Sequence, residues 1–589
     1  MTRFAVWAPQ ARSVAVAVGD ERRQASSGGP GSQPGWWTLD APDIGHGGRY
    51  AFVLDAGDVG PAEELPDPRS RWQPEGVHAR SAVVEDSTFA WTDASWRGLP
   101  LPGAVLYELH VGTFTSAGTF DAAIERLEHL AGLGIDAVEL LPCNAFDGAR
   151  GWGYDGVDLY AVHEPYGGPD GLKRFVDACH ARGLAVVMDV VYNHLGPAGN
   201  YLARFGPYFT EAHSTPWGAA VNLDAPGSDE VRRFLLDNAL MWLRDYHCDG
   251  LRLDAVHALR DDRAVHLLEE LSREVKQLRV STGRELFLVA ESDLNDPRLV
   301  RPVEAGGYGL DAQWCDDVHH ALWATLSGER QGYYVDFGGL DVLAKAMRSA
   351  FVHDGGYSSF RGRSHGRPAT GVPGWRFVTF LQDHDQIGNR AQGDRAAAVL
   401  SDGLLKVGAA LLLLSPFTPM LFMGEEWGAR TPWQFFSDHS GELGEAVRVG
   451  RRAEFAEHGW ATEDVPDPQA LATFERSTLD WDEPAGERGA MLLDWHRRLI
   501  ALRRTEPDLA GPRERVRCSV DPGGRWLVLH RGSLAVVAAF SPERTAVPLE
   551  GTPVAVVLAS EQGFSFADGH IELPGESVAL VRLLQPPVG

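Results

Sequence analysis

Short apolar runs alternate with amphipathic segments of helical length through the middle of the chain. The segments 120–134, 171–183 and 229–248 repeat apolar residues every three or four positions, which predicts helices with one buried face. The runs between such segments are nearly continuous in apolar residues, which predicts strands buried on both faces. Eight such runs occur, at 104–114, 135–142, 184–194, 250–256, 286–293, 310–317, 376–385 and 419–427. This order predicts an α/β fold built on a (β/α)8 TIM barrel.

Both ends of the chain follow a different pattern, in which short alternating runs are separated by Gly, Pro, Ser and Asp. Such runs are typical of small β-sandwiches. A proline-rich connection, residues 65–81, leads out of the first of them. We therefore predict an N-terminal β-sandwich over residues 1–92, the barrel with insertions over 93–504 and a C-terminal β-sandwich over 515–589.

The 589-residue chain has a net charge of −27, from 54 basic and 81 acidic residues. This charge argues against nucleic acid and anionic membranes as partners, and a neutral substrate is easier to reconcile with it. The 18 tryptophans must mostly pack in cores, but their number is also what a sugar-binding protein shows, because indole faces stack on pyranose rings. Composition thus favours an uncharged ligand and leaves its chemistry open.

The five cysteines, an odd number without any CxxC pair, argue against zinc sites and a disulfide framework. A reducing cytoplasm is therefore favoured. The first 20 residues lack the continuous apolar region of a secretory signal. The longest apolar run, 407–424, contains two prolines and is predicted to be a buried helix followed by a buried strand, not a membrane span.

Charged residues follow several predicted strands at their carboxyl ends, where the chemistry of a TIM barrel lies. One acidic strand end is explained as well by a structural ion pair as by catalysis. Several acids on one rim are harder to explain by stability, because crowded like charges cost free energy. The strand-end residues are Asp189, Asn193 and His194 in the third run, Arg252 and Asp254 in the fourth, Glu291 in the fifth, and His384 and Asp385 in the seventh.

Three carboxylates on one rim suit glycoside hydrolysis, in which one acid attacks the anomeric carbon, a second protonates the leaving oxygen and a third stabilises the transition state. Arg252 lies two residues before Asp254 on the same strand face, and a neighbouring cation keeps a carboxylate ionised, as a nucleophile requires. Glu291 follows the apolar residues 287–290 with no cation nearby in sequence, which favours a raised pKa and a general-acid role. A divalent metal site is the alternative, but the chain has neither an HExxH motif nor an EF-hand loop.

Four segments resemble, in order and spacing, the signature motifs of the α-amylase family, glycoside hydrolase family 13. The resemblance implies a (β/α)8 barrel, a retaining double displacement and a C-terminal β-domain, and we expect no cofactor and no catalytic metal. Carried over by position, Asp254 is the nucleophile, Glu291 the acid/base and Asp385 the transition-state stabiliser. The four segments are residues 189–194, 250–257, 288–292 and 380–385.

The same resemblance assigns residues to sugar binding. Arg252, His194 and His384 would surround the sugar that is attacked, and His257, which closes the second motif, is a further candidate. Tyr154 resembles the tyrosine that stacks beneath that sugar, although a loop tyrosine is the simpler explanation.

Two positions bear on details of the resemblance. Asn193 resembles a residue that helps to hold calcium in some members of the family, so the sequence leaves open whether a structural Ca²⁺ binds here. Asp383 stands where the family usually has Asn, which is expected to alter the local charge around Asp385.

Further segments resemble one group within the family, the hydrolases that release trehalose from maltooligosyltrehalose. Residues 4–16 resemble the N-terminal sandwich that these hydrolases share with isoamylases and branching enzymes. The implied reaction is hydrolysis of the α-1,4 bond adjacent to the terminal trehalose. The resemblance also implies a functional partner, maltooligosyltrehalose synthase, which isomerises the reducing end of maltooligosaccharides to trehalose. The segments that carry the closer resemblance are 65–78, 306–322, 328–337, 384–390, 423–439 and 465–481.

The loops around the predicted site supply candidates for reading the trehalose unit. For each of them, bracing of its own loop is an equal explanation. These candidates are Asp316, Asp317, His319 and His320 after the sixth run and Gln386 and Asn389 after the seventh.

Two rival functions stay open. A glucan branching enzyme would use the same three carboxylates and pass the glycosyl group to a sugar hydroxyl instead of water. A non-catalytic glucan-binding protein is disfavoured, because a lost activity removes the reason to keep Asp254, Glu291 and Asp385 together.

Overall fold

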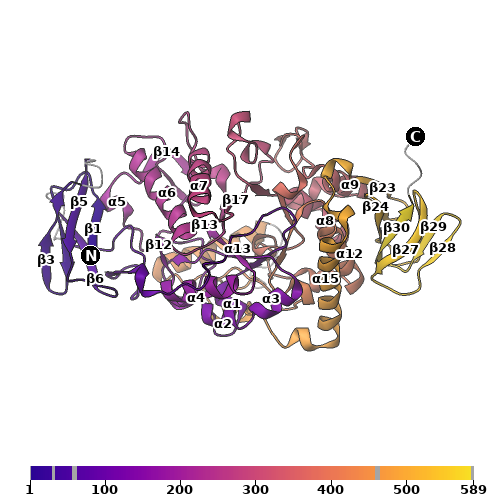
Figure 1. Ribbon diagram of the computed structural model, residues 1–589, viewed down its shortest axis with the longest axis horizontal. Coiled ribbons are helices and arrows are strands. Elements are labelled where there is room, and N and C mark those ends of the chain that lie inside the picture. Colours follow the sequence, from indigo (N-terminus) through magenta and orange to yellow (C-terminus); the bar gives the residue numbers. More distant parts are fainter. Residues whose placement is uncertain (1, 29–33, 56–62, 458–464, 585–589) are drawn as a thin grey trace.

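The computed structural model describes residues 2–28, 34–55, 63–457 and 465–584, and its centre is a closed barrel of eight parallel strands (Figure 1). Each strand pairs with the next one along the chain, and the last pairs with the first. Seven of the eight predicted runs contain one of these strands, and the eighth run covers all of β22 except its first residue, Thr418, which confirms the TIM barrel. The strands are β9 (Leu106–Leu109), β10 (Ala137–Leu140), β13 (Ala185–Val190), β16 (Gly250–Leu253), β17 (Phe287–Ala290), β18 (Ala312–Trp314), β21 (Phe377–Phe380) and β22 (Thr418–Phe422).

Amphipathic helices cover the outside of the barrel. In α4 (Gly168–His180) the buried residues Leu172, Phe175, Val176 and Cys179 follow the spacing i, i+3, i+4, i+7, which turns one apolar stripe toward the strands. The other main helices are α2 (Phe120–Ile124), α3 (Leu127–Leu133), α6 (Ser228–Arg244), α7 (Leu267–Thr282), α8 (Asp316–Ser327), α9 (Leu340–Ser349), α12 (Asp402–Leu413), α13 (Gly441–Glu457), α14 (Leu471–Arg476) and α15 (Glu487–Thr505).

One crossover departs from the predicted alternation of strands and helices. Between β17 and β18 the chain forms two 3₁₀ turns, η5 (Pro297–Leu299) and η6 (Val303–Ala305), in place of an α-helix. Pro302 precedes the second turn, and Gly306 ends it with a left-handed φ of 75°. Prolines and a left-handed glycine at this spacing interrupt the hydrogen-bond ladder that an α-helix needs.

The apolar run 407–424 divides as predicted into the buried end of α12 and the buried strand β22. Ser401 caps α12, and its hydroxyl accepts the backbone N–H of Leu404 at 3.1 Å. None of the helices in the described ranges has both the length and the apolar character that crossing a membrane requires.

Two antiparallel sheets form the N-terminal part, at the indigo end of the molecule (Figure 1). Trp7 packs edge-on against Tyr208 with ring centroids 5.6 Å apart, and Trp36 donates a hydrogen bond to Glu230 of α6 at 3.1 Å. These contacts hold the sheets against the barrel. The strands are β1 (Thr2–Trp7), β4 (Ser26–Ser27) and β5 (Trp36–Ala41) in one sheet and β2 (Ser13–Val18), β3 (Glu21–Gln24), β6 (Arg49–Asp55), β7 (Glu64–Leu65) and β8 (Ser81–Ala82) in the other.

Two further antiparallel sheets form the C-terminal part, at the yellow end (Figure 1). Lys406 of α12 pairs with Glu561 at 2.7 Å, and Arg531 donates to the carbonyl of Leu414 at 3.0 Å, so polar contacts join this part to the barrel. The domain limits given by the sequence stay predictions. The strands are β23 (Arg517–Asp521), β24 (Trp526–Arg531), β25 (Leu534–Ala539), β27 (Thr552–Ala559) and β30 (Ser577–Leu584) in one sheet and β26 (Thr545–Pro548), β28 (Ser565–Ala567) and β29 (His570–Leu573) in the other.

The barrel interior changes from apolar to charged along the strand direction. Leu106 and Val187 belong to an apolar cluster that fills the interior near the strand starts. Inward-facing positions recur every two residues along a strand, so the next inward side chains are Glu108 and Asp189, both buried. Charge is therefore concentrated at the carboxyl ends of the strands.

Candidate active site

A cleft of about 470 Å³ lies over the carboxyl ends of the strands. Asp254 lines it directly after β16, Glu291 directly after β17, and Asp385 in the short helix α10 (His384–Gly388) that follows β21. The structure thus brings the three predicted catalytic acids together. Five predicted sugar-binding residues also line the cleft, namely Tyr154, His194, His257, His384 and Asn389.

Asp254 is fixed by donors on both of its carboxylate oxygens. Arg252 Nη1 lies 2.6 Å from Oδ1, and Asn193 Nδ2 donates to Oδ2 at 2.9 Å. The amide oxygen of Asn193 lies 2.5 Å from His194 Nδ1, so its side chain bridges two residues of the cleft. The two donors fix the direction of the Asp254 carboxylate, and one of them is the cationic guanidinium.

Asp189 extends this network beneath the cleft. It accepts from Arg252 Nη1 at 2.8 and 3.0 Å and from the hydroxyl of Tyr154 at 2.7 Å. Burial raises the pKa of Asp189 to about 6, although Arg252 opposes the shift. The same hydroxyl lies 2.8 Å from His384 Nε2, so Tyr154 is tied to the network and does not lie in a free loop.

Glu291 lies beside Asp254 because β16 and β17 are neighbours in the barrel. Leu253 pairs with Ala290, so the residues that follow are also adjacent. Glu291 Oε2 accepts the backbone N–H of Ala255 at 2.5 Å, and Ala255 has a left-handed φ of 39°, which side chains rarely adopt. This contact helps to hold the strained turn after Asp254.

Burial raises the pKa of Glu291 well above its usual range, while Arg252 opposes the shift and Asp254 reinforces it. This is the direction that the sequence favours for a general acid. The reason is different, however, because Arg252 Nη2 lies 3.7 Å from Glu291 Oε2. No cation is near Glu291 in sequence, but Arg252 is near it in space, and burial is the main cause of the raised pKa.

Asp385 is the most exposed of the three acids, with 51% of its side chain accessible, against 13% for Asp254 and 15% for Glu291. His384 Nε2 lies 3.7 Å from Asp385 Oδ1, and Asn389 donates to the same oxygen at 3.3 Å. Asp385 is therefore positioned by its own helix and remains open to a ligand.

Asp383, the departure from the family pattern, is buried and caps α10 by accepting the backbone N–H of Gln386 at 2.6 Å. Burial, followed by the repulsion of Glu108, raises the pKa of Asp383 well above its usual range. A neutral carboxyl is close in shape and charge to the Asn of the family. The replacement therefore adds less negative charge near Asp385 than the sequence suggests.

The remaining predicted substrate-binding residues lie outside the cleft lining. Asp317 accepts the backbone N–H groups of Val352 and His353 at 2.7 and 2.8 Å and braces their loop. His319 is buried, with its ring nitrogens 2.9 Å from the Leu381 carbonyl and 3.1 Å from the Tyr334 hydroxyl, and burial lowers its pKa to about 3. The residues outside the lining are Arg252, Asp316, Asp317, His319, His320 and Gln386.

Several cleft residues have no counterpart among the predictions, and two of them have long side chains that border the site. Trp217, 51% exposed, lies at the turn between β14 (Phe209–Thr215) and β15 (Gly218–Val221) and stacks on His194 with centroids 5.4 Å apart. Arg451 of α13 donates to the carbonyl of Gly388 at 2.6 Å. A tryptophan between Pro and Gly in a turn was the available signal for the first, and nothing in the pattern pointed to the second.

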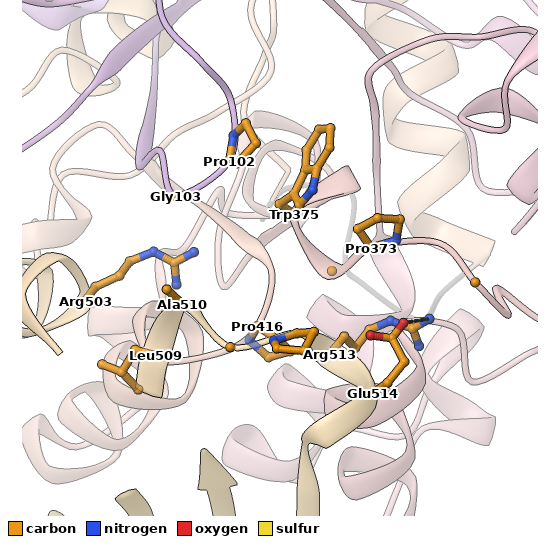
Figure 2. Close-up of a pocket in the computed structure, with 14 residues that line it drawn as sticks. Pro102, Gly103, Pro373, Trp375, Pro416, Arg503, Leu509, Ala510, Arg513 and Glu514 are labelled. Carbon is orange, nitrogen blue, oxygen red and sulfur yellow. Dashed lines mark ion pairs between the residues drawn. The ribbon is translucent and has the colours of Figure 1, made fainter. Parts of the chain in front are cut away.

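A larger cavity, about 590 Å³, lies at the opposite end of the barrel (Figure 2). Pro102, Trp375 and Pro416, which precede β9, β21 and β22, line it together with residues 509–514. Among the described residues that line it, Glu514 is the single carboxylate, 3.8 Å from Arg513. The acid pair that glycoside hydrolysis needs is therefore in the smaller cleft.

Replacing Arg252 by Ala is expected to lower the stability of the barrel by about 3–5 kcal/mol, because it leaves the buried Asp189 and the partly buried Asp254 without their counter-ion. The shift of the urea unfolding midpoint measures this. Arg263→Ala is the matched control, since Arg263 pairs with Asp229 at the surface, where a pair contributes about 1 kcal/mol at most. Equal shifts for the two variants would contradict the account.

The two central acids are in different electrostatic settings. Asp254 is hydrogen-bonded to a cation, and Glu291 is driven toward its neutral form. A carboxylate beside a neutral carboxyl is the pair that a retaining glycosidase uses as nucleophile and acid. Aromatic faces for sugar rings come from Tyr154, Trp217 and Phe435.

Comparison with known proteins agrees with this chemistry. Residues 87–212 match the family described as alpha amylase, catalytic domain, and residues 1–70 match carbohydrate-binding module 48, the isoamylase N-terminal domain. The fold and the site thus define a glycoside hydrolase of the α-amylase type.

Relatives that match along their full length show to which family of these glycoside hydrolases the chain belongs. The chain is 56% identical to the malto-oligosyltrehalose trehalohydrolase of Arthrobacter ramosus over 99% of both chains, and 51% identical to that of Mycobacterium tuberculosis over 100% of both. The crystal structure of a Salmonella typhimurium protein assigned to the alpha amylases matches with a TM-score of 0.89 at 38% identity, covering 99% of this chain and 97% of that one. The chain belongs to the malto-oligosyltrehalose trehalohydrolase family.

Proposed function

We propose that this protein hydrolyses the α-1,4-glucosidic bond next to the terminal trehalose of maltooligosyltrehalose, with trehalose and a shortened maltooligosaccharide as products. The observation that carries the proposal is identity with trehalohydrolases along the whole chain, far beyond the barrel motifs that branching enzymes also have. The cleft supports it with an acid pair suited to retaining hydrolysis.

In the first step, Glu291 donates its proton to the glycosidic oxygen while an Asp254 oxygen attacks the anomeric carbon. The bond between that carbon and the glycosidic oxygen breaks, trehalose leaves, and a β-glycosyl ester forms on Asp254. The neutral form of Glu291, favoured by burial, supplies the proton. The Arg252 contact directs the Asp254 carboxylate for attack.

In the second step, Glu291 is a carboxylate and takes a proton from water as the water oxygen attacks the same carbon. The ester bond to Asp254 breaks, and the new reducing end forms with the original α configuration. Glu291 is protonated again and Asp254 is a free carboxylate. One water is consumed for each bond cleaved.

Asp385 and the residues around it bind the sugar as its ring flattens toward the oxocarbenium-like transition state. Asp385 is the exposed carboxylate of the site and carries the charge that stabilises this state. Tyr154 lines the cleft with its hydroxyl bound to Asp189 and one ring face stacked on His384, so only the other face is offered to the sugar.

The substrate must come from an enzyme that makes a trehalose unit at the reducing end of maltooligosaccharides, and maltooligosyltrehalose synthase is therefore the functional partner. We place the protein in the cytoplasm. The five cysteines support this, since all are free thiols and four are buried.

The proposal predicts rapid release of trehalose from maltotriosyltrehalose and little action on maltopentaose, because only the first presents trehalose as the leaving group. Chromatography of the products, with a reducing-end assay, measures both. New reducing ends must appear in step with trehalose. Longer or rearranged glucans without new reducing ends would instead show a branching enzyme, and turnover of neither substrate would show a binding protein.

A further inference from the structure

Glu108, on the inner face of β9, is almost fully buried at 1% exposure and lies directly behind His384. Its Oε2 accepts the backbone N–H of His384 at 3.0 Å, and its Oε1 lies 2.5 Å from His384 Nδ1. One carboxylate thus holds both the main chain and the ring of the histidine. Because a carboxylate oxygen only accepts, Nδ1 carries a proton in this contact.

The opposite ring nitrogen is also a donor, as its neighbours show. His384 Nε2 lies 2.8 Å from the hydroxyl of Tyr154, and that hydroxyl donates its single proton to Asp189 at 2.7 Å. The hydroxyl oxygen can then only accept from Nε2. With protons on both nitrogens, His384 is an imidazolium cation.

The groups that face His384 come from several elements. Burial lowers the pKa of His384, but Glu108 and then Asp385 outweigh it and raise the pKa to about 10, with Arg252 of β16 opposing. His110 also lies close enough for its own pKa to be lowered by His384, after the larger effect of burial, and the charge of His384 opposes the raised pKa values of Asp189, Asp383 and Glu139. Glu108 is thus the strongest source of the positive charge.

A second carboxyl lies next to Glu108 and provides a natural control. Glu139 of β10 is the register partner of Glu108 and is 1% exposed, and neither of its oxygens has a hydrogen-bond partner among the described residues. Burial, followed by the repulsion of Glu108, raises the pKa of Glu139 well above its usual range. The neutral carboxyl is therefore Glu139, and the acceptor of both His384 bonds is Glu108.

We propose that Glu108 is a positioning residue of this enzyme, which keeps His384 doubly protonated and aimed at the sugar-binding side of the cleft. The cation lies 3.7 Å from Asp385 and supplies its counter-charge, and its Nε2–H is the donor that faces Tyr154 and the cleft. A neutral ring, fixed in the other tautomer, would lose this donor. The inference rests on the proposed hydrolysis and assigns no contact between Glu108 and substrate.

Glu108→Gln tests the proposal, because it keeps the shape and removes the charge. We expect kcat/KM for trehalose release to fall by about 10- to 100-fold near neutral pH, the range seen when a carboxylate that orients a metal-bound histidine is removed. Without Glu108 the pKa of His384 is lower, so the ring loses its positive charge at a lower pH than in the wild type. The ratio of wild-type to variant activity must therefore increase with pH between 5 and 9. A ratio that is constant with pH would overturn the proposal.

Two variants separate this effect from simple destabilisation. Glu139→Gln replaces a neutral group by a neutral group at the neighbouring position, so the shape of its pH profile must match the wild type even if its melting temperature falls. Glu108→Asp keeps the charge, and it must recover the wild-type pH dependence at least in part. If the pH profile of Glu139→Gln moved to lower pH as much as that of Glu108→Gln, the cause would be altered packing and the proposal would be wrong.

An activity-independent measurement keeps the inference distinct from the proposed function. In protein labelled with ¹⁵N-histidine, the His384 resonances, assigned by their loss in His384→Gln, must show two protonated ring nitrogens at pH 8 in the wild type and one in Glu108→Gln. A neutral His384 ring in the wild type would refute the inference. Failure to release trehalose together with a protonated ring would refute the proposed function alone.

Discussion

Replacing Asp254 by Asn is expected to lower kcat for trehalose release by about 10⁴- to 10⁶-fold, the range seen when the central group of a covalent mechanism is removed. The amide is nearly isosteric and keeps a contact with Asn193, but it is too weak a nucleophile to form the glycosyl ester. Steady-state rates on maltotriosyltrehalose measure the loss.

Asp293→Asn is the matched control for this prediction. Asp293 lines the same cleft and pairs with Arg361 at 2.6 Å, but it has no part in the proposed chemistry. A much smaller loss is expected for it. If Asp293→Asn were as inactive as Asp254→Asn, the loss would reflect the charge of the cleft and not a nucleophile.

Replacing Glu291 by Gln is expected to lower kcat by about 10²- to 10⁴-fold on maltotriosyltrehalose, the typical contribution of a general acid. The loss in the glycosylation step should be far smaller on α-maltosyl fluoride, because fluoride leaves without a proton. The first-turnover rates of trehalose release and of fluoride release measure the two, because every later turnover of either substrate also needs Glu291 as the base. Asp254→Asn must lose both activities, and an equal loss of both in Glu291→Gln would argue against its role as the acid.

The pH dependence of the wild type follows from the same residue. The raised pKa of Glu291 keeps its carboxyl protonated at neutral pH, and activity must fall as pH rises through that pKa. With α-maltosyl fluoride, glycosylation needs no proton from Glu291. Its single-turnover rate should therefore lack the alkaline loss that trehalose release shows.

The acids of the site could be predicted because each follows a strand whose apolar pattern is clear in the sequence. The parallel register then makes Asp254 and Glu291 neighbours, since Leu253 pairs with Ala290. The same register brings Arg252 within 3.7 Å of Glu291, which spacing along the chain did not reveal. Local sequence thus indicates which side chains reach the rim, whereas charges across strands depend on pairing.

The site residues on loops and helices were less predictable, because packing decides whether their side chains point toward the cleft. His319 and His320 follow β18 on α8, where both rings turn into the core and not toward the cleft. Trp217 lies at a hairpin turn outside the strand pattern, and Arg451 comes from a helix far along the chain. Glu108 lies inside an apolar run, and only the closed barrel shows that it contacts His384.

The most direct test of the central claim, a retaining hydrolysis that releases trehalose, is the early ¹H NMR time course of wild-type protein with maltotriosyltrehalose. The account predicts equal amounts of trehalose and maltotriose, with the new maltotriose reducing end appearing first as the α anomer and equilibrating with β only later. Maltotriose that appears first as the β anomer would contradict the double displacement through Asp254. Rearranged glucans without trehalose would contradict the hydrolysis itself.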